Sequence, residues 1–311
     1  MKIGNVHLAN NVWLSPMEGV NCWAFRQVCK EYDAGLIATP MILVNRLMSE
    51  REIQLNVVNF RKGEHPLQVQ LGGSDTEMIK QSTLLLDEYA DIFDMNLGCP
   101  KSNILSLKAG CFFNKHPEQL KKVIPPIMNN TNKPVTAKIR VGWDAEHKNV
   151  VEMVKILEDF GVAAITVHGR TKQQKGGGKA DWNEIRKAKD AANVPIIGNG
   201  DITLPGHAKA MIEQTGCDGV MIATAAKGNP LIFKTTAHLL KTGKNMPEPS
   251  DHERAKSFLR FAHYYDDQPR KALTEFRQHA HWFANWFESW RVMRAQINRA
   301  EDYDEIKRVF K

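Results

Sequence analysis

The chain has 311 residues, 42% of them hydrophobic and 25% charged, and carries a formal net charge of +7. This composition is typical of a soluble globular protein, and a chain of this length can bury a full core without disulfides. No apolar run approaches the roughly 18 residues of a membrane span. No apolar signal region follows Lys2, so we expect a cytoplasmic protein without membrane contact.

The charge and the cysteines bear on partners and compartment. An excess of positive charge favours an anionic partner such as nucleic acid, although many basic proteins bind none. The five cysteines are odd in number, and their spacing fits neither a disulfide framework nor zinc ligands. We therefore expect reduced thiols and no metal site.

The first two-thirds of the chain alternates short apolar runs with amphipathic helical patterns. One helix is expected to open with a capping box at Ser74 and Glu77, and another to end at Gly161. Eight runs are nearly continuously apolar, which is typical of strands buried on both faces. They are residues 12–16, 35–40, 67–71, 91–97, 135–141, 163–168, 195–198 and 219–224.

Eight strands alternating with helices predict an α/β fold, a (β/α)8 TIM barrel, over residues 1–241. The alternative is an open doubly wound sheet, which usually has fewer strands and a glycine-rich turn after the first. Here the first strand leads into PMEGV (16–20), without a GxGxxG turn, so the barrel is favoured.

A polar, proline-marked stretch after residue 241 leads to a small helical bundle, which we expect over residues 250–311. Ser250 and Glu253 form a second predicted capping box. Residues 251–311 hold 12 of the 25 aromatic residues of the chain. This change of composition predicts a separate C-terminal domain.

Three tryptophans in this segment follow one another at intervals of four, so we expect them on one helix face. They are Trp282, Trp286 and Trp290. The favoured interpretation is the apolar seam of the bundle. The alternative is a stacking surface for unpaired bases, with arginines beside the phosphates. Those arginines are Arg277, Arg291 and Arg294.

Polar residues at the strand ends predict where the chemistry lies, because TIM barrels keep their active sites at the C-terminal ends of the strands. Lys138 would place a cation at the centre of the barrel mouth, where a flavin needs positive charge near its pyrimidine edge. The alternative is a lysine whose head reaches solvent. The sequence NGD (199–201) suits a phosphate site built from backbone N–H groups. Cys99, between Gly98 and Pro100, could donate a proton if its thiol stays protonated.

Several of these segments resemble motifs of the tRNA-dihydrouridine synthases, flavoproteins that reduce the C5–C6 bond of uridine in tRNA. They occur in the order and approximate spacing of that family, and DMNLGCP with KIRVGW and HGRT is the specific combination. A C-terminal FRQHAHWF (276–283) is similar to a motif of the family's helical domain. The matching barrel segments are PMEGV (16–20), VQLGG (69–73), DMNLGCP (94–100), KIRVGW (138–143), TVHGRT (166–171) and PIIGNGDI (195–202).

The resemblance implies FMN as the cofactor, NADPH as the reductant and tRNA as the partner, and we expect a monomer. It implies that Cys99 is the general acid that protonates uracil C5 after hydride transfer to C6. Substrate contacts are expected from Asn96, Arg140, Arg277 and Arg291. Because a stacked base is out of reach, the target nucleotide must be extruded into the barrel mouth. The residues expected to hold FMN are Pro16, Met17, Gln70, Lys138, His168, Asn199, Gly200, Asp201, Ala223 and Thr224.

The chain departs from the family pattern at the end of the eighth strand, where Ala223-Thr224 stands in place of the usual Gly-Arg. This removes an arginine charge from the expected phosphate site, and Lys227 is a candidate to replace it. The basic loop Lys172 to Lys179 is expected to be either a second RNA contact or a solvated loop. Two other functions remain open: an FMN barrel acting on a free pyrimidine, as in dihydroorotate dehydrogenases, and a degenerate RNA-binding barrel without flavin.

Overall fold

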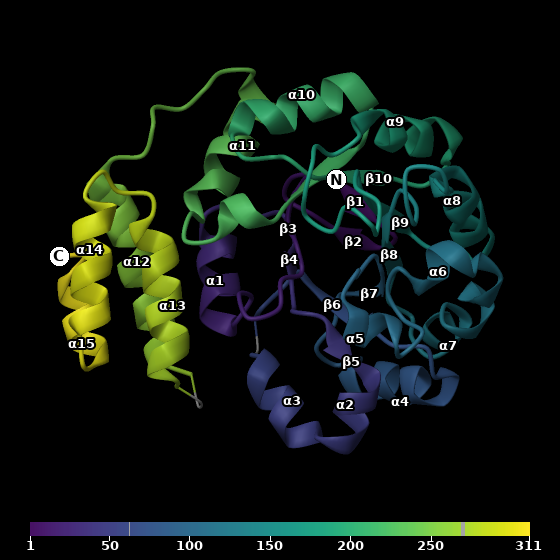
Figure 1. Cartoon of the computed structure of the whole chain (residues 1–311), viewed down its shortest axis with the longest axis horizontal. Helices are drawn as coiled ribbons and strands as arrows, with labels where there is room; N and C mark the ends of the chain where they lie inside the picture. The colour runs from purple at the N-terminus through teal and green to yellow at the C-terminus, as the bar shows by residue number, and fades with distance from the viewer. Residues whose placement is uncertain (62, 269–270) are drawn as a thin grey trace.

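The computed structural model describes residues 1–61, 63–268 and 271–311. Its centre is a parallel barrel surrounded by helices (Figure 1). The strands follow one another in the order β3-β11-β10-β9-β8-β7-β6-β4, and a parallel bridge between Trp13 and Leu36 closes the ring. The Leu14 N–H donates to the Leu36 carbonyl at 2.9 Å across this seam. The predicted (β/α)8 TIM barrel is therefore confirmed.

The strands match the eight predicted runs, with bounds that differ by one to a few residues. The second predicted strand, residues 35–40, is the least regular, since only Ile37–Ala38 (β4) pairs there and a further short strand, Ile42–Leu43 (β5), also pairs with β6. The other barrel strands are β3 (Val12–Leu14), β6 (Leu67–Gly72), β7 (Ile92–Leu97), β8 (Val135–Arg140), β9 (Ala164–His168), β10 (Ile196–Asn199) and β11 (Gly219–Ile222).

Helices cover the outside of the barrel and make most of the connections. They are α1 (Trp23–Glu31), α2 (Val44–Ser49), α3 (Arg51–Val58), α4 (Thr76–Leu86), α5 (Ser102–Leu105), α6 (Phe112–Lys115), the 3₁₀ helix η1 (Pro117–Lys122), α7 (Pro125–Met128), α8 (Val150–Asp159), α9 (Trp182–Ala191), α10 (Pro205–Thr215), the 3₁₀ helix η2 (Thr224–Ala226) and α11 (Leu231–Thr242). Among the described residues, no helix is both long and apolar enough to cross a membrane.

A short hairpin that the sequence did not predict covers the N-terminal end of the barrel. Its strands are β1 (Lys2–Ile3) and β2 (Val6–His7). Ile3 is fully buried in an apolar cluster with Trp13, Ile92 and Ile197. The hairpin therefore closes this end and leaves the C-terminal ends of the strands for ligands.

The interior of the barrel is polar on one side, although TIM-barrel interiors are usually filled by branched apolar residues. Neighbouring strands contribute Gln68, Asp94 and Thr136, which are fully or nearly fully buried. Their side chains are joined by hydrogen bonds, with Gln68 Nε2 donating to Thr136 Oγ1 at 3.0 Å. Because side chains alternate along a strand, the apolar neighbours of these residues face the outer helices. The strands are therefore nearly continuously apolar in sequence, although these three inward-facing side chains are polar.

The predicted helix boundaries are partly right. The end at Gly161 is confirmed: α8 stops at Asp159, and Gly161 has φ +85°. The capping box at Ser74 and Glu77 is wrong. Asp75 is the N-cap of α4 and its carboxylate accepts from the Met78 N–H at 2.8 Å. Aspartate is at least as good an N-cap as serine, so the N-cap is one residue later than predicted.

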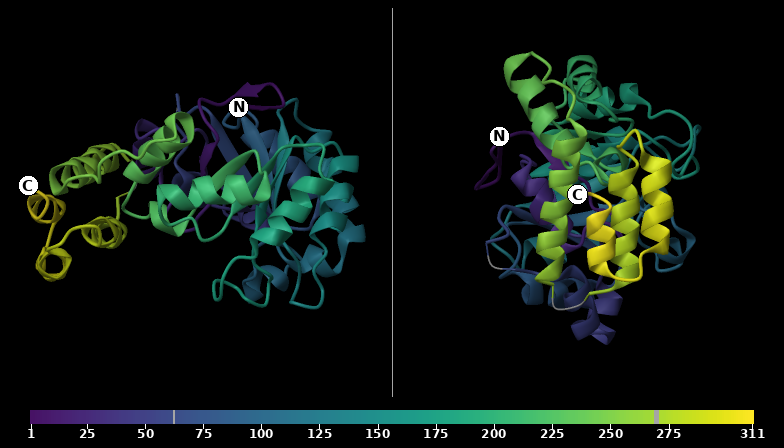
Figure 2. Two further views of the ribbon diagram at one scale, coloured as in Figure 1. Left: turned by 90° about the horizontal axis from the view of Figure 1, so that it is seen from above. Right: turned by 90° about the vertical axis from the view of Figure 1, so that its left-hand side faces the viewer.

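Four further helices of the described residues stand beside the barrel (Figure 2), and the first of them packs against α1. The capping box of Ser250 and Glu253 is confirmed at the start of the first of them. Their shared core is built from phenylalanines, and Phe258 packs against Phe276 and Phe283. The helices are α12 (Asp251–Asp266), α13 (Leu273–Ala284), α14 (Trp290–Arg299) and α15 (Tyr303–Arg308).

The three tryptophans do not share one helix face, as the sequence had suggested. Trp282 lies in α13, Trp286 follows the end of this helix and Trp290 begins α14. All three are partly exposed, and phenylalanines take the apolar seam instead. The interval of four was misleading because α13 ends at Ala284, so the chain turns between the first and second tryptophan.

Candidate active site

Cys99 lies in the loop after β7, at the C-terminal end of the barrel. Its carbonyl accepts from the Cys111 N–H at 3.0 Å, and its side chain is partly exposed. Burial raises the pKa of the Cys99 thiol, against the lowering effects of the Lys101 N–H and nearby positive charges. The thiol is thus protonated at neutral pH, as a proton donor must be.

A line of hydrogen bonds connects the barrel interior to the Cys99 loop. Thr136 Oγ1 and Gln70 Nε2 each donate to the Asp94 carboxylate at 2.6 Å. Asn96 Nδ2 donates to Gln70 Oε1 at 2.8 Å. Asn96 Oδ1 in turn accepts from the Cys99 N–H at 3.0 Å and from the Gly98 N–H at 3.2 Å. Gln70 and Asn96 are therefore held by the same network that fixes Cys99.

Asp94, at the centre of this network, was given no role by the sequence analysis. It is fully buried, and burial raises its pKa to about 6, although Gln70, Thr136 and Lys138 oppose that rise. The available signal was an acidic residue in the middle of an otherwise apolar strand, two positions before Asn96. Such a residue faces the interior with Asn96 and is costly to bury without partners.

Lys138 reaches the centre of the barrel mouth from β8. Its Nζ donates to Asn199 Oδ1 at 2.9 Å, and Asn199 Nδ2 donates to the Met221 carbonyl at 2.8 Å. Within the described part of the chain, Lys138 forms no ion pair. Burial, followed by the Arg140 charge, lowers the pKa of Lys138 to about 8. An ammonium with no carboxylate partner fits an anionic or carbonyl-rich ring placed above it.

His168 and Asp201 lie beside this cation at the ends of β9 and β10. Burial, together with the charges of Lys138, Arg140 and Arg170, lowers the pKa of His168 to about 2, so the imidazole is neutral. The Asp201 carboxylate accepts from Arg170 Nη2 and from the Ala180 N–H, both at 2.6 Å. Burial would raise the pKa of Asp201, but these bonds lower it. Arg170 thus keeps Asp201 in place.

Pro16 and Met17 follow β3 at the same end of the barrel and are partly exposed. The Met17 carbonyl accepts from the Asn21 N–H at 3.1 Å, which turns the chain toward α1. Gly200 has φ +121°, and a Cβ there would lie 3.1 Å from the His168 ring. The structure therefore brings Pro16, Met17 and Gly200 to the mouth where Lys138 and His168 lie.

Comparison with known proteins gives the family. Residues 13–311 match the model described as dihydrouridine synthase. The chain belongs to the dihydrouridine synthase family. It is 33% identical over 308 residues to tRNA-dihydrouridine synthase B of Xanthomonas axonopodis pv. citri, and this match covers 98% of this chain and 92% of that protein. It is 35% identical over 313 residues to tRNA-dihydrouridine synthase B of Salmonella typhimurium, which covers 98% of this chain and 96% of that protein.

Solved structures support the barrel alone. A 6-hydroxypseudooxynicotine amine oxidase of Pseudomonas geniculata superimposes with a TM-score of 0.60 at 12% identity, over 78% of this chain and 48% of that one. A histamine dehydrogenase of Rhizobium sp. gives a TM-score of 0.57 at 12% identity, over 78% of this chain and 47% of that one. This dihydrouridine synthase family member spans about half the length of both.

The departure of this family member at the eighth strand lies at the start of η2. Ala223 precedes this short helix and Thr224 opens it, with Thr224 exposed. The first N–H groups of a helix have no partner within it, so they remain available to a ligand. Lys227 Nζ lies over the Trp282 ring, 5.4 Å from its centroid, and so faces the C-terminal helices. That placement gives no support to the expectation that Lys227 replaces the arginine charge at the phosphate site.

Arg140 is almost fully buried and organises two loops of the mouth. Its Nε donates to the Gly98 carbonyl at 2.8 Å, and its Nη1 donates to the carbonyls of Thr171 and Lys175 at 2.9 and 2.6 Å. Arg170 holds the same loop through the Gly177 carbonyl, at 3.1 Å. The basic loop Lys172 to Lys179 is therefore anchored to the barrel mouth through its backbone, while its residues 173–179 are exposed.

The two arginines expected to contact RNA in this family member differ in their surroundings. Arg277 in α13 is partly buried, and its Nη2 donates to the Ala300 carbonyl at 2.6 Å. Arg291 in α14 is exposed, with its guanidinium 5.0 Å from the centroid of the Trp290 ring. Arg291 is therefore placed to meet a partner, whereas Arg277 ties α13 to the chain between α14 and α15.

Proposed function

We propose that this protein reduces uridine in tRNA to 5,6-dihydrouridine, using bound FMN and taking its electrons from NADPH. The observation that carries the proposal is a protonated thiol, Cys99, at the mouth of a barrel whose centre holds Lys138, a lysine that pairs with no carboxylate of the described residues. Membership of the dihydrouridine synthase family supports the reaction, and similarity to proteins named tRNA-dihydrouridine synthase B supports tRNA as the substrate. We further propose that the protein works as a monomer in the cytoplasm.

The residues present fit a flavin. The Lys138 ammonium has a carboxamide partner, Asn199, and can still donate to the pyrimidine edge of an isoalloxazine ring. Gln70 lies on β6 and His168 on β9, on either side of the strand β8 that carries Lys138. The N–H groups around Gly200 and Thr224 can receive a phosphate. Pro16, Met17, Asn199, Asp201 and Ala223 complete the proposed cofactor set. When bound, FMN supplies the hydride that reaches uracil C6.

The protein's own residues do the remaining work. Cys99 gives its thiol proton to C5, which completes the reduction of the double bond. Asn96, fixed between Gln70 and the Cys99 loop, presents an N–H toward the same space and can hold a uracil carbonyl. Arg140 acts by holding the loops around the substrate. The target base must leave the RNA stack to reach these groups.

We propose residues 1–241 as the catalytic domain and residues 250–311 as an RNA-binding domain. The C-terminal helices carry exposed cations beside tryptophans, with Arg291 and Arg294 both over Trp290. Such pairs can contact phosphates and unstacked bases. This arrangement favours a macromolecular substrate over a free pyrimidine, which needs no such surface.

The test is the Cys99→Ala variant. The purified protein should show flavin absorption bands that bleach with NADPH under nitrogen in both wild type and variant. Dihydrouridine formation in tRNA should fall about 10²- to 10⁴-fold in the variant, the usual contribution of a general acid. Cys217→Ala, a buried cysteine at the opposite end of the site's strands, is the control. Equal product formation by Cys99→Ala and wild type would remove Cys99 from its role, and a protein that cannot take up FMN would favour RNA binding without catalysis.

A further inference from the structure

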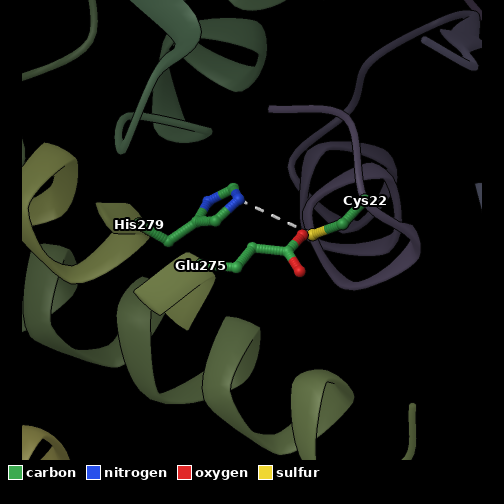
Figure 3. Close-up of side chains that lie close together, drawn as sticks. All are labelled: Cys22, Glu275 and His279. Atoms are coloured by element: carbon green, nitrogen blue, oxygen red, sulfur yellow. Dashed lines mark hydrogen bonds between the residues drawn. The ribbon is translucent and has the colours of Figure 1, made fainter. Parts of the chain in front are cut away.

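Three side chains from two distant parts of the chain converge between the barrel and the C-terminal helices (Figure 3). Cys22 is the N-cap residue of α1, and Glu275 and His279 lie in α13. The sulfur, one carboxylate oxygen and one imidazole nitrogen all lie within 4.8 Å of one another. These residues belong to α1 and α13, whereas Cys99 follows β7, so the cluster is separate from the candidate active site.

The spacing of these atoms is that of ligands around one metal ion. Cys22 Sγ and His279 Nε2 are 3.7 Å apart. Zinc binds sulfur at about 2.3 Å and imidazole nitrogen at about 2.0–2.1 Å, so tetrahedral geometry places the two ligand atoms roughly 3.5 Å apart. Glu275 and His279 are four residues apart on one helix. This interval puts two side chains on one face and is used by known zinc motifs.

The charges also suit a buried divalent cation. His279 is fully buried and Cys22 nearly so. A thiolate, a carboxylate and a neutral imidazole together balance the two positive charges of zinc, so the occupied site would be neutral. Burial lowers the pKa of His279 to about 3, which leaves a neutral ring with a lone pair for a metal. Burial and then the Glu275 charge raise the pKa of Cys22 to about 12, so metal binding would release the thiol proton.

The surroundings supply an outer partner and room for a fourth ligand. The Tyr265 hydroxyl lies 3.2 Å from Glu275 Oε2, and hydrogen bonds of this kind orient metal-binding carboxylates. A cavity of about 230 Å³ is lined by Cys22, Glu275 and Gln268, among others. It is large enough to admit a water molecule as the fourth ligand.

We propose that Cys22, Glu275 and His279 bind one zinc ion, which joins α1 of the barrel to α13 of the C-terminal helices. Cysteine spacing predicted no metal site because Cys22 is more than 250 residues from Glu275 and His279, and only the fold brings the three together. The proposal does not depend on the flavin or on the reductase reaction. Zinc here would hold the barrel and the C-terminal helices in a fixed arrangement.

The experiment is metal analysis of the full-length, untagged protein from zinc-supplemented cells. We expect stoichiometric zinc after gel filtration, and replacement by cobalt should give a sulfur-to-metal charge-transfer band. Cys22→Ala should lose both signals, and Cys217→Ala should keep both. A chelator should lower the Tm of wild type and of Cys217→Ala, and leave that of Cys22→Ala unchanged.

Glu275→Gln serves as a second variant if Cys22→Ala folds poorly. It keeps the size of the side chain and a hydrogen-bonding partner for Tyr265. Its zinc affinity should fall by more than the roughly 10- to 100-fold expected for losing an outer partner. Absence of zinc from the wild type together with no binding on titration would overturn the proposal. Zinc binding that Cys22→Ala and Glu275→Gln leave intact would overturn it equally.

Discussion

At the scale of single residues, Asp94 sets the direction of the hydrogen bonds that lead to Cys99. An ionised carboxylate can only accept, so it fixes the Gln70 amide with Nε2 inward. The Gln70 oxygen must then accept from Asn96 Nδ2, and the Asn96 oxygen must accept from the Cys99 N–H. Both amides consequently present N–H groups, which suit the carbonyl oxygens of a pyrimidine.

The Asp94→Asn variant tests this role. Asparagine can donate as well as accept, so neither amide is held in one orientation. Hydrogen bonds to charged groups contribute about 1.5–3 kcal/mol, so product formation should slow about tenfold or more. In wild type, the rate should also fall as the pH drops through about 6, because Asp94 then becomes protonated. Single-turnover dihydrouridine formation across pH measures both effects.

In that experiment Asp94→Asn should lack the acidic limb while retaining bound flavin and its bleaching by NADPH. A folded variant with the rate and pH profile of wild type would show that Asp94 serves packing only. Circular dichroism and the Tm establish that the variant is folded.

At the scale of elements, β8 places Lys138 under the proposed flavin. The lysine is charged below its pKa of about 8 and neutral above it. An anionic ligand favours the charged form, so FMN affinity should fall as the pH rises through about 8. Fluorescence titration of the flavin-free protein at pH 7 and pH 9 measures this. Lys138→Met should bind weakly at both pH values, and a wild-type affinity that does not change with pH would contradict the role.

Gly110, in the turn between α5 and α6, lies close against the backbone of Cys99. This glycine has φ +62°, and a Cβ would lie 2.5 Å from the Cys99 carbonyl oxygen. Gly110→Ala combines left-handed backbone strain with a clash against backbone, so we expect the free energy of unfolding to fall by about 1–2 kcal/mol or more. Gly206→Ala is the matched control, because a Cβ there meets nothing within 4 Å. Denaturant unfolding compares them, and equal stabilities would refute the expectation.

The secondary-structure elements also show how much of the fold could be predicted from the sequence. Continuous apolar runs located all eight barrel strands, since strands between a packed interior and outer helices bury both faces. The split second strand escaped prediction because β4 and β5 each pair over only two residues. The N-terminal hairpin has four strand residues in all, too few for any pattern. The prediction that the three tryptophans share one helix face was wrong because local spacing does not reveal where α13 ends.

The site was predictable where a residue is placed by its own strand, and less so where distant segments meet. Positions such as Lys138 and Cys99 follow from strand ends alone. Their functional roles came from the family resemblance and stay predictions. The buried guanidinium of Arg140 shows the limit, because its carbonyl partners lie in a loop more than 30 residues away. The inward turn of Arg277 depends on the packing of α13 near Ala300, which the sequence does not encode locally.

At the scale of the whole molecule, the excess of positive charge should act on RNA through exposed cations and not through buried ones. Arg291→Gln removes an exposed guanidinium, so tRNA affinity should weaken and the dependence of log K on log salt should become shallower by about one. Arg277→Gln removes a group that donates to the Ala300 carbonyl, so the Tm should fall while the salt slope stays unchanged. Filter binding over a range of salt concentrations, with Tm measurements on the same samples, separates the two. Equal loss of salt slope in both variants would mean that Arg277 leaves its partner to meet phosphate, and an unchanged slope for Arg291→Gln would place the RNA on another face.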